Sequence, residues 1–414
     1  MRARAASRIR SRLETVRNAA NSALMGTPGT VVDRGLEGVS VGTTALSAVD
    51  GGAGRLTYRG FDIDDLAGSA SFEEVAYLLL FGDLPTSRRL ADFNVRLAAS
   101  RTLPRAVLEW LATMPHESWP MDVLRTAISA LALFEPNQDE VAHPSNIRTA
   151  ISLIAKTPTI VAAWDRIRRG LRPIEPLPHL TSAANFLYMR SGKMPIFEAE
   201  RALDMYFVLL ADHSFNASTF AARVTASTMA DIFACTTSAI AALGGDLHGG
   251  APGKVMAAML AIDAPENAVG YVREALRHGD RIMGMGHREY RVRDPRARHL
   301  EVMARDLAEA SNSRWYAVAR ALEDAASAAL AASKPDRPLL ANVEFYTAPT
   351  LYALGIPADE FTCLFACSRM AGWTAHVLEQ IADNRLIRPQ AAYAGPTDRP
   401  WVAIDRRELL ETRG

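Results

Sequence analysis

The sequence of 414 residues contains 46 basic and 46 acidic residues, and apolar residues make up 49% of it. This composition is typical of a globular protein with a large core that divides into two or three lobes. Proteins that bind nucleic acid or anionic membrane surfaces usually carry an excess of basic residues, which this chain lacks. We therefore expect neither nucleic acid nor a membrane as a partner. The sequence contains no run of about eighteen apolar residues, so we expect no membrane span.

Cysteine usage and the N-terminal composition bear on the compartment. Three cysteines are too few for a disulfide framework and favour a reducing compartment. Residues 1–34 are predicted to form an N-terminal arm, and its first 25 residues carry six arginines and one acid. A mitochondrial transit peptide has such a composition, but the whole chain is rich in arginine and has only four lysines. We therefore favour a solvated helical arm and a cytoplasmic location in a bacterium over the mitochondrial matrix.

Helical periodicity dominates the rest of the chain and predicts an all-α fold. Residues 71–81 begin with a serine cap and an acidic first turn, followed by an apolar stripe. The other predicted helices cover residues 196–211, 217–243 as one long helix, 296–310, 313–332, and 358–383 with a break near Gly372.

Strand signals are scarce and lie near the N-terminus. Residues 39–46 and 54–58 flank a turn at residues 50–52, which predicts a small β hairpin. Residues 169–180 and 391–400 are rich in proline, arginine or glycine and are predicted to be connecting loops.

Two histidines lie where predicted helices stop. His213 ends one apolar helix, and His248 lies in a glycine-lined turn ahead of another helix. The positive end of a helix dipole lowers the pKa of a nearby histidine. The neutral imidazole can then donate a hydrogen bond to a carbonyl that becomes an enolate. The alternative is a buried histidine that only satisfies a capped turn.

A third histidine, His287, precedes a strong helix start. Asp294 is placed as the cap and Pro295 as the first helical residue. Arg296 then falls in the first turn, where a cation opposes the dipole. Its position is explained if an anion binds there. The alternative is an arginine paired with a nearby acid.

Three more charged residues occur in apolar or loop surroundings. Glu344 is enclosed by apolar and aromatic neighbours. Partial burial would raise its pKa and make it a base for a weakly acidic carbon, unless it is simply salt-bridged in a domain contact. Arg369 interrupts an apolar helix and Arg388 precedes a proline in a loop. A buried arginine needs an anionic partner, which can be a structural acid or a substrate carboxylate.

The sequence does not predict a metal site. Cys363 and Cys367 lie four residues apart, but no second pair accompanies them. We expect them to be small buried hydrophobic residues. The three histidines above also lack the spacing of metal ligands.

Five motifs occur in one order along the chain: DHxxNAST from residue 212, LHGGAP from 247, GxGHRxYRxxDPR from 284, NVEFY from 342 and RxxGWxAHxxEQ from 369. With them the chain resembles the citrate synthase family from Gly35 to Pro389, most strongly after residue 213. The resemblance implies an all-α homodimer without a cofactor or a metal. Its large domain would cover residues 35–248 and 351–414, and its small domain residues 249–350. It also implies condensation of acetyl-CoA with oxaloacetate, followed by thioester hydrolysis.

The resemblance also implies roles for individual residues. His248 would hold the thioester oxygen of the acyl-CoA enolate, and His287 would polarise and protonate the ketone of oxaloacetate. Glu344 would be the base, and Arg291 would face the CoA phosphates. The carboxylates and carbonyl of oxaloacetate would be bound by His213, Arg296, Arg369 and, reaching in from the other subunit, Arg388.

One departure from the family pattern bears on activity. The family usually has aspartate where this chain has Glu344, and an extra methylene moves the carboxylate by about 1 Å, which can cost about 100-fold in rate. Glu289 is a smaller departure, because an apolar residue is usual there. A working citrate synthase is favoured. A 2-methylcitrate synthase using propionyl-CoA, or a catalytically impaired paralogue that binds ligands, are the alternatives.

Overall fold

The computed structural model describes residues 35–36, 38–135, 143–333, 339–404 and 406–407. Two units are distinguished: Thr44–Ile387, and a unit formed by the two ends of the chain, Met1–Thr43 and Arg388–Gly414. The predicted arm, residues 1–34, lies outside the described residues. The division into a large and a small domain at residues 249 and 350 stays a prediction.

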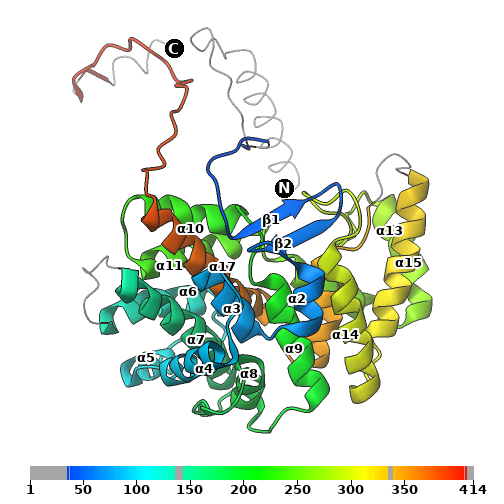
Figure 1. Cartoon of the computed structure of the whole chain (residues 1–414). Helices are drawn as coiled ribbons and strands as arrows, with labels where there is room; N and C mark the ends of the chain where they lie inside the picture. The colour runs from blue at the N-terminus through cyan, green and yellow to red at the C-terminus, as the bar shows by residue number, and fades with distance from the viewer. Residues whose placement is uncertain (1–34, 37, 136–142, 334–338, 405, 408–414) are drawn as a thin grey trace. The chain divides into compact units, whose positions relative to one another are not determined.

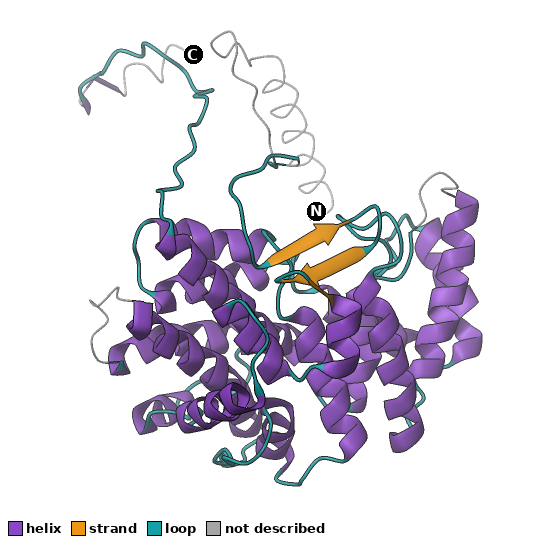
Figure 2. Cartoon of the chain, in the orientation of Figure 1, coloured by secondary structure: helices purple, strands orange, loops and turns teal. Residues whose placement is uncertain are grey.

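The unit Thr44–Ile387 is built almost wholly of helices, which confirms the all-α fold (Figure 2). Among the described residues, every helix is too short or too polar to cross a membrane. The strands are β1 (Ser47–Asp50), β2 (Arg55–Tyr58) and β3 (Phe61–Asp62). The helices of its first half are α2 (Ile63–Ser69), α3 (Phe72–Phe81), α4 (Ser87–Ser100), α5 (Arg105–Leu111), α6 (Pro120–Leu131), the 3-10 turn η1 (Ala132–Phe134), α7 (His143–Arg168), α8 (Ser182–Ser191) and α9 (Phe197–Leu210).

The second half continues with α10 (Ala217–Ser227), α11 (Ile232–Leu243), α12 (Ala251–Ile262), η2 (Pro265–Asn267), α13 (Ala268–Arg277), α14 (Pro295–Ser311), α15 (Trp315–Ser333), α16 (Val343–Ala353), η3 (Ala358–Glu360) and α17 (Phe361–Ala382). Figure 1 shows α13, α14 and α15 on one side of this unit and α3 to α8 on the other, with α9 between them. The apolar core runs through the whole unit.

Four predicted helices are confirmed within two residues at each end. In α3, the Ser71 hydroxyl accepts from the Glu74 amide, and the Glu74 carboxylate accepts from the Ser71 amide, which is a complete capping box. The predictions at 196–211, 296–310 and 313–332 correspond to α9, α14 and α15. The predicted loop at residues 169–180 is also observed.

The hairpin exists, but the prediction for its first strand was wrong. β1 pairs antiparallel with β2 from Ser47 opposite Tyr58 to Asp50 opposite Arg55, and β3 adds a third strand. The Asp50 side chain accepts from the amides of Gly52 and Ala53, so the turn begins directly after Asp50. β2 has only four residues, and the turn places Asp50 opposite the first of them. The residues paired with β2 are therefore Ser47–Asp50 rather than residues 39–46.

The single helix predicted for residues 217–243 is two helices, α10 and α11, packed against each other. Met229 adopts a positive φ of 65°, and the Asp231 side chain accepts from the Ala234 amide to cap α11. The small residues do allow close approach, since the hydroxyls of Thr225 and Ser238 lie 2.9 Å apart across the pair.

Gly372 does not break a helix, contrary to the prediction. α17 runs unbroken through it and is buried from Phe361 to Leu378. A Cβ at position 372 would lie 2.3 Å from the carbonyl oxygen of Ala211. Glycine is therefore required there by the close approach of the segment that follows α9.

Candidate active site

The candidate active site is assembled at the ends of helices. His213 follows α9 and His287 lies in the loop before α14, and their ring centroids are 5.6 Å apart. Tyr290 contacts both rings: its hydroxyl lies 3.1 Å from His213 Nε2, and its ring centroid 4.7 Å from that of His287. Burial, followed by the nearby Arg296, keeps the pKa of His213 well below its ordinary value. The ring is therefore neutral.

Two other segments hold the loop that carries His287. The amide of Arg291 donates to the carbonyl of Gly51 in the hairpin turn (2.8 Å), and a Cβ at Gly51 would collide with the carbonyl of Glu289. On the other side, the Asn342 side chain donates to the Gly286 carbonyl (2.8 Å). The minor β element thus helps to position a site residue.

The protonation state of His287 follows from its backbone contacts. The amides of Glu289 and Tyr290 both donate to Nδ1, at 3.0 and 3.2 Å. Since an amide can only donate, Nδ1 carries no proton and the neutral ring bears it on Nε2. Burial and the charge of Arg296 lower the pKa of His287 to about 4.

His248 has the opposite tautomer. The amide of Ser218, in the first turn of α10, donates to Nε2 (3.3 Å), so the proton of the neutral ring is on Nδ1. The Ser218 hydroxyl lies 2.9 Å from the same Nε2 and accepts from the indole N–H of Trp373 (3.1 Å). The pKa of His248 is lowered to about 4, in the predicted direction, by burial and by the charge of Arg369.

Arg296 has a protein partner. Its guanidinium donates to both carboxylate oxygens of Asp294, at 3.0 and 2.8 Å, and Asp294 caps α14 as predicted. Burial alone would lower the pKa of Arg296, but Asp294 raises it, so the side chain stays charged. The paired-acid alternative is therefore observed, with the pair buried, and contact of Arg296 with a substrate stays a prediction.

Arg369 is buried without a carboxylate partner among the described residues. Its Nε–H donates to the carbonyl of Leu210 (2.7 Å), and its guanidinium lies over the Phe365 ring at 4.7 Å. Burial lowers its pKa to about 10. A buried cation with so little compensation favours an anionic ligand.

Glu344 has the features of a base. It lies in the first turn of α16, where its amide donates to the Asn342 side chain (3.1 Å). Its Oε2 atom is buried and has no hydrogen-bond partner among the described residues. Burial raises the pKa of Glu344, partly offset by Arg296, which confirms the predicted direction.

One predicted residue of this unit is not brought into this group. The Arg291 side chain is exposed and only its backbone contributes a contact. Arg388 belongs to the unit formed by the chain ends. Their roles stay predictions. Glu289, the smaller departure, is exposed and contributes its backbone to the His287 loop.

Sequence reasoning assigned no role to several residues of the site. Tyr290 and Asn342 lie inside quoted motifs, and Ser218 and Trp373 do as well. Tyr290 and Ser218 contact histidines, Asn342 contacts the His287 loop, and Trp373 contacts Ser218. The motif letters do not carry that information.

The cysteines behave as expected, since Cys363 and Cys367 are both buried and free. Among the described residues, no group of three or more His, Cys, Asp and Glu residues is arranged to hold a metal ion. The expectation that the protein uses no metal stays a prediction.

Comparison with known proteins identifies the class to which this fold and site belong. Residues 35–390 match the family model described as citrate synthase, C-terminal domain. A citrate synthase of Haloferax volcanii is 44% identical, with 90% of this chain and 98% of that protein covered. A 2-methylcitrate synthase of Mycobacterium tuberculosis is also 44% identical, with 89% and 92% covered.

Solved structures agree. Citrate synthase from Pyrobaculum aerophilum is 38% identical with a TM-score of 0.85, covering 92% of this chain and 97% of that one. The Thermoplasma acidophilum enzyme, in a ternary complex with carboxymethyl coenzyme A and oxaloacetate, is 31% identical with a TM-score of 0.85, covering 91% and 100%. These are enzymes with the same helical fold. The chain belongs to the citrate synthase family.

Proposed function

We propose that this protein condenses acetyl-CoA with oxaloacetate and hydrolyses the resulting thioester to citrate and CoA. The observation that carries the proposal is the complementary protonation of two neutral histidines. His248 presents an N–H at Nδ1 and His287 presents one at Nε2, each fixed by backbone amides on the opposite nitrogen. Condensation needs two such donors, one for the thioester oxygen and one for the ketone oxygen.

The base in this scheme is Glu344. Its carboxylate takes a proton from the methyl group of acetyl-CoA while His248 donates a hydrogen bond to the thioester oxygen, which carries the enolate charge. The enol carbon bonds to the ketone carbon of oxaloacetate, and His287 supplies the proton to the new hydroxyl. Water then cleaves the thioester and releases the thiol of CoA. The raised pKa of Glu344 suits it to this proton transfer.

Oxaloacetate is a dianion, and the buried arginines suit it. Arg369 has no carboxylate partner among the described residues, and Arg296 shares its charge only with Asp294. We propose that these two arginines and His213 bind the oxaloacetate carboxylates and carbonyl. In a homodimer, Arg388 would reach in from the partner subunit, and Arg291 would face the CoA phosphates. The buried free thiols fit a cytoplasmic location.

The test is CoA-thiol release from acetyl-CoA and from propionyl-CoA, each with and without oxaloacetate. Oxaloacetate-dependent release supports condensation, and release without oxaloacetate would indicate a plain thioesterase. A larger kcat/KM for propionyl-CoA would assign the protein as a 2-methylcitrate synthase. Folded protein that releases no thiol from either substrate would contradict the proposal and favour the impaired paralogue.

A further inference from the structure

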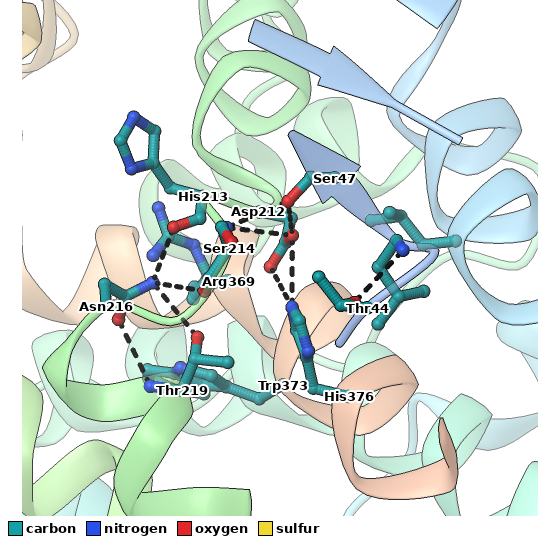
Figure 3. A network of polar contacts seen from close by, with 12 residues as sticks. Thr44, Ser47, Asp212, His213, Ser214, Asn216, Thr219, Arg369, Trp373 and His376 are labelled. Atoms are coloured by element: carbon teal, nitrogen blue, oxygen red, sulfur yellow. Dashed lines mark hydrogen bonds and ion pairs between the residues drawn. The ribbon is translucent and has the colours of Figure 1, made fainter. Parts of the chain in front are cut away.

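One face of α17 holds the segment that carries His213. Arg369, Gly372 and His376 recur at helical spacing, and they contact three consecutive residues, the last residue of α9 and the two that follow it. Arg369 donates to the carbonyl of Leu210, and the Gly372 amide donates to the carbonyl of Ala211 (3.1 Å). His376 then reaches Asp212, the residue directly before His213 (Figure 3).

Asp212 is a fully buried carboxylate that plays no part in the proposed chemistry. Oδ2 accepts from the Ser47 hydroxyl, from the Ser214 amide (3.3 Å) and from His376 Nε2 (3.2 Å). Its backbone N–H and carbonyl both bond to the Tyr58 hydroxyl. Burial alone would raise the pKa of Asp212, but His376 and the charge of Arg369 lower it, so the side chain stays an anion.

The proton between His376 and Asp212 has a fixed direction. Arg223 donates to His376 Nδ1 (3.0 Å), so the neutral ring carries its proton on Nε2 and donates it to Asp212. Arg223 is itself held by Glu379 (2.6 Å) and lies over the Phe215 ring at 4.4 Å. The donor that His376 presents to the Asp212 carboxylate is therefore held in turn by Arg223.

Packing alone does not require a buried carboxylate hydrogen-bonded to a neutral histidine, since replacing both partners of a buried hydrogen bond by apolar groups of the same shape can be nearly neutral or stabilising. The location of the Asp212–His376 pair next to His213 explains its presence better. Figure 3 shows the His213 ring pointing away from Asp212, with the turn 212–214 between them. Ser214 holds a positive φ of 51° in that turn, a conformation that the bond from its amide to Asp212 helps to fix.

We propose that Asp212 and His376 are positioning residues for oxaloacetate binding, and this inference rests on the proposed function. The His376 proton fixes the Asp212 carboxylate, which fixes the turn that aims His213 and supplies a buried negative charge near Arg369. Neither side chain touches the substrate. Both act by holding His213 and Arg369 ready before oxaloacetate arrives.

The experiment compares two variants of one position. In His376→Gln, the side-chain amide can place an N–H near the position of Nε2, whereas His376→Leu fills similar space without a donor. We expect His376→Leu to raise the KM and the calorimetric Kd for oxaloacetate by about 10-fold to 100-fold, with kcat changed less. His376→Gln is expected to stay within about three-fold of the wild type, because one hydrogen bond is retained.

Asp204→Asn is the matched control for damage to folding. Asp204 is a half-buried carboxylate on α9 that accepts from the Phe72 amide (3.1 Å) and contacts none of the site residues named above. Its oxaloacetate KM should equal that of the wild type. Melting temperatures of all variants separate loss of fold from loss of positioning.

The outcomes are distinct. If His376→Leu melts lower but binds oxaloacetate as the wild type does, the pair is only structural and the inference is overturned. Equal weakening in the Gln and Leu variants would overturn the role of the Nε2 proton. If the wild type itself binds no oxaloacetate, the proposed function fails together with the inference, whereas a normal wild type with unaffected variants refutes the inference alone.

Discussion

The sharpest test of the site is to restore the usual family residue, Glu344→Asp. The backbone at this position is held from several sides. The amide of Val343 donates to Asp294 (3.1 Å), and that of Asn342 donates to the carbonyl of Gly284 (3.0 Å). The Asn342 side chain also bonds both the Glu344 amide and the His287 loop. The helix start therefore cannot easily move forward to compensate for a shorter side chain.

The magnitude follows from this rigidity. Removing one methylene withdraws the carboxylate by about 1 Å, and a misplacement of that size can cost about 100-fold in rate. We expect kcat with acetyl-CoA to fall by about this factor, while the KM for oxaloacetate and the melting temperature change little. Glu344→Gln, which keeps the length and removes the base, should fall at least as far, since general base catalysis contributes about 100-fold to 10,000-fold.

The assay is steady-state thiol release with oxaloacetate saturating. A kcat that rises in Glu344→Asp would refute the reasoning, because it would show that the glutamate impairs a site still arranged for aspartate. Unchanged turnover in Glu344→Gln would remove this residue from the mechanism altogether.

Three further predictions concern charge. Arg369→Met should raise the KM for oxaloacetate by about 100-fold, while the melting temperature stays the same or rises. The reason is that the substitution removes a buried cation, whose pKa is lowered to about 10 by burial. A lower melting temperature with an unchanged KM would contradict this prediction. In the wild type, kcat/KM measured between about pH 5 and pH 8 should rise as Glu344 ionises, because the pKa of Glu344 is raised. His248 should not contribute to this rise, because its pKa of about 4 leaves it neutral throughout. An acidic limb that survives in Glu344→Gln would refute Glu344 as the ionising group. Finally, burial and Asp165 raise the pKa of Glu360 to about 8, and neither carboxyl oxygen has a hydrogen-bond partner among the described residues. Because the pKa of Glu360 is higher in the folded protein than in the unfolded chain, where it is about 4.5, the free energy of unfolding falls as pH rises from about 4.5 to about 8 and stays low above it. Glu360→Gln should therefore raise the melting temperature by about 5 °C at alkaline pH and by less in acid. An equal shift at both pH values would contradict this prediction.

How far the sequence predicts this fold depends on whether a signal is local. The capping box at Ser71 and the Asp294–Pro295 start of α14 are local patterns, and both are observed. The end of α10 was missed because Asp231 lies in a run of small residues that continues the helical periodicity on both sides. The prediction for Gly372 was wrong because glycine is required there by the close approach of a backbone segment that is distant in sequence, which no local pattern reveals.

The site shows the same limit. Motifs identified the three histidines, the two buried arginines and Glu344, but they could not assign the tautomers of His248 and His287. Those depend on which backbone amide faces which ring nitrogen. The amide that faces His248 comes from Ser218, 30 residues away, and those that face His287 come from Glu289 and Tyr290. The lowered pKa of His248 was predicted, but the contributions of burial and of Arg369 depend on residues distant in sequence.

The placement of these groups explains why an all-helical fold provides a reactive site. Helix ends leave amides and carbonyls without intrahelical partners. Here the Ser218 amide in the first turn of α10 fixes one histidine, and the Leu210 carbonyl at the end of α9 fixes Arg369. α17 supplies what the ends cannot, because a continuous buried helix keeps Arg369 and Trp373 at a fixed separation. Trp373 bonds Ser218, and Arg369 bonds the segment leading to His213, so a shift of this one helix would disturb the groups proposed for both substrates at once. Coupling through a rigid element of this kind is what condensation requires, since both partners must be held in register before the carbon–carbon bond forms.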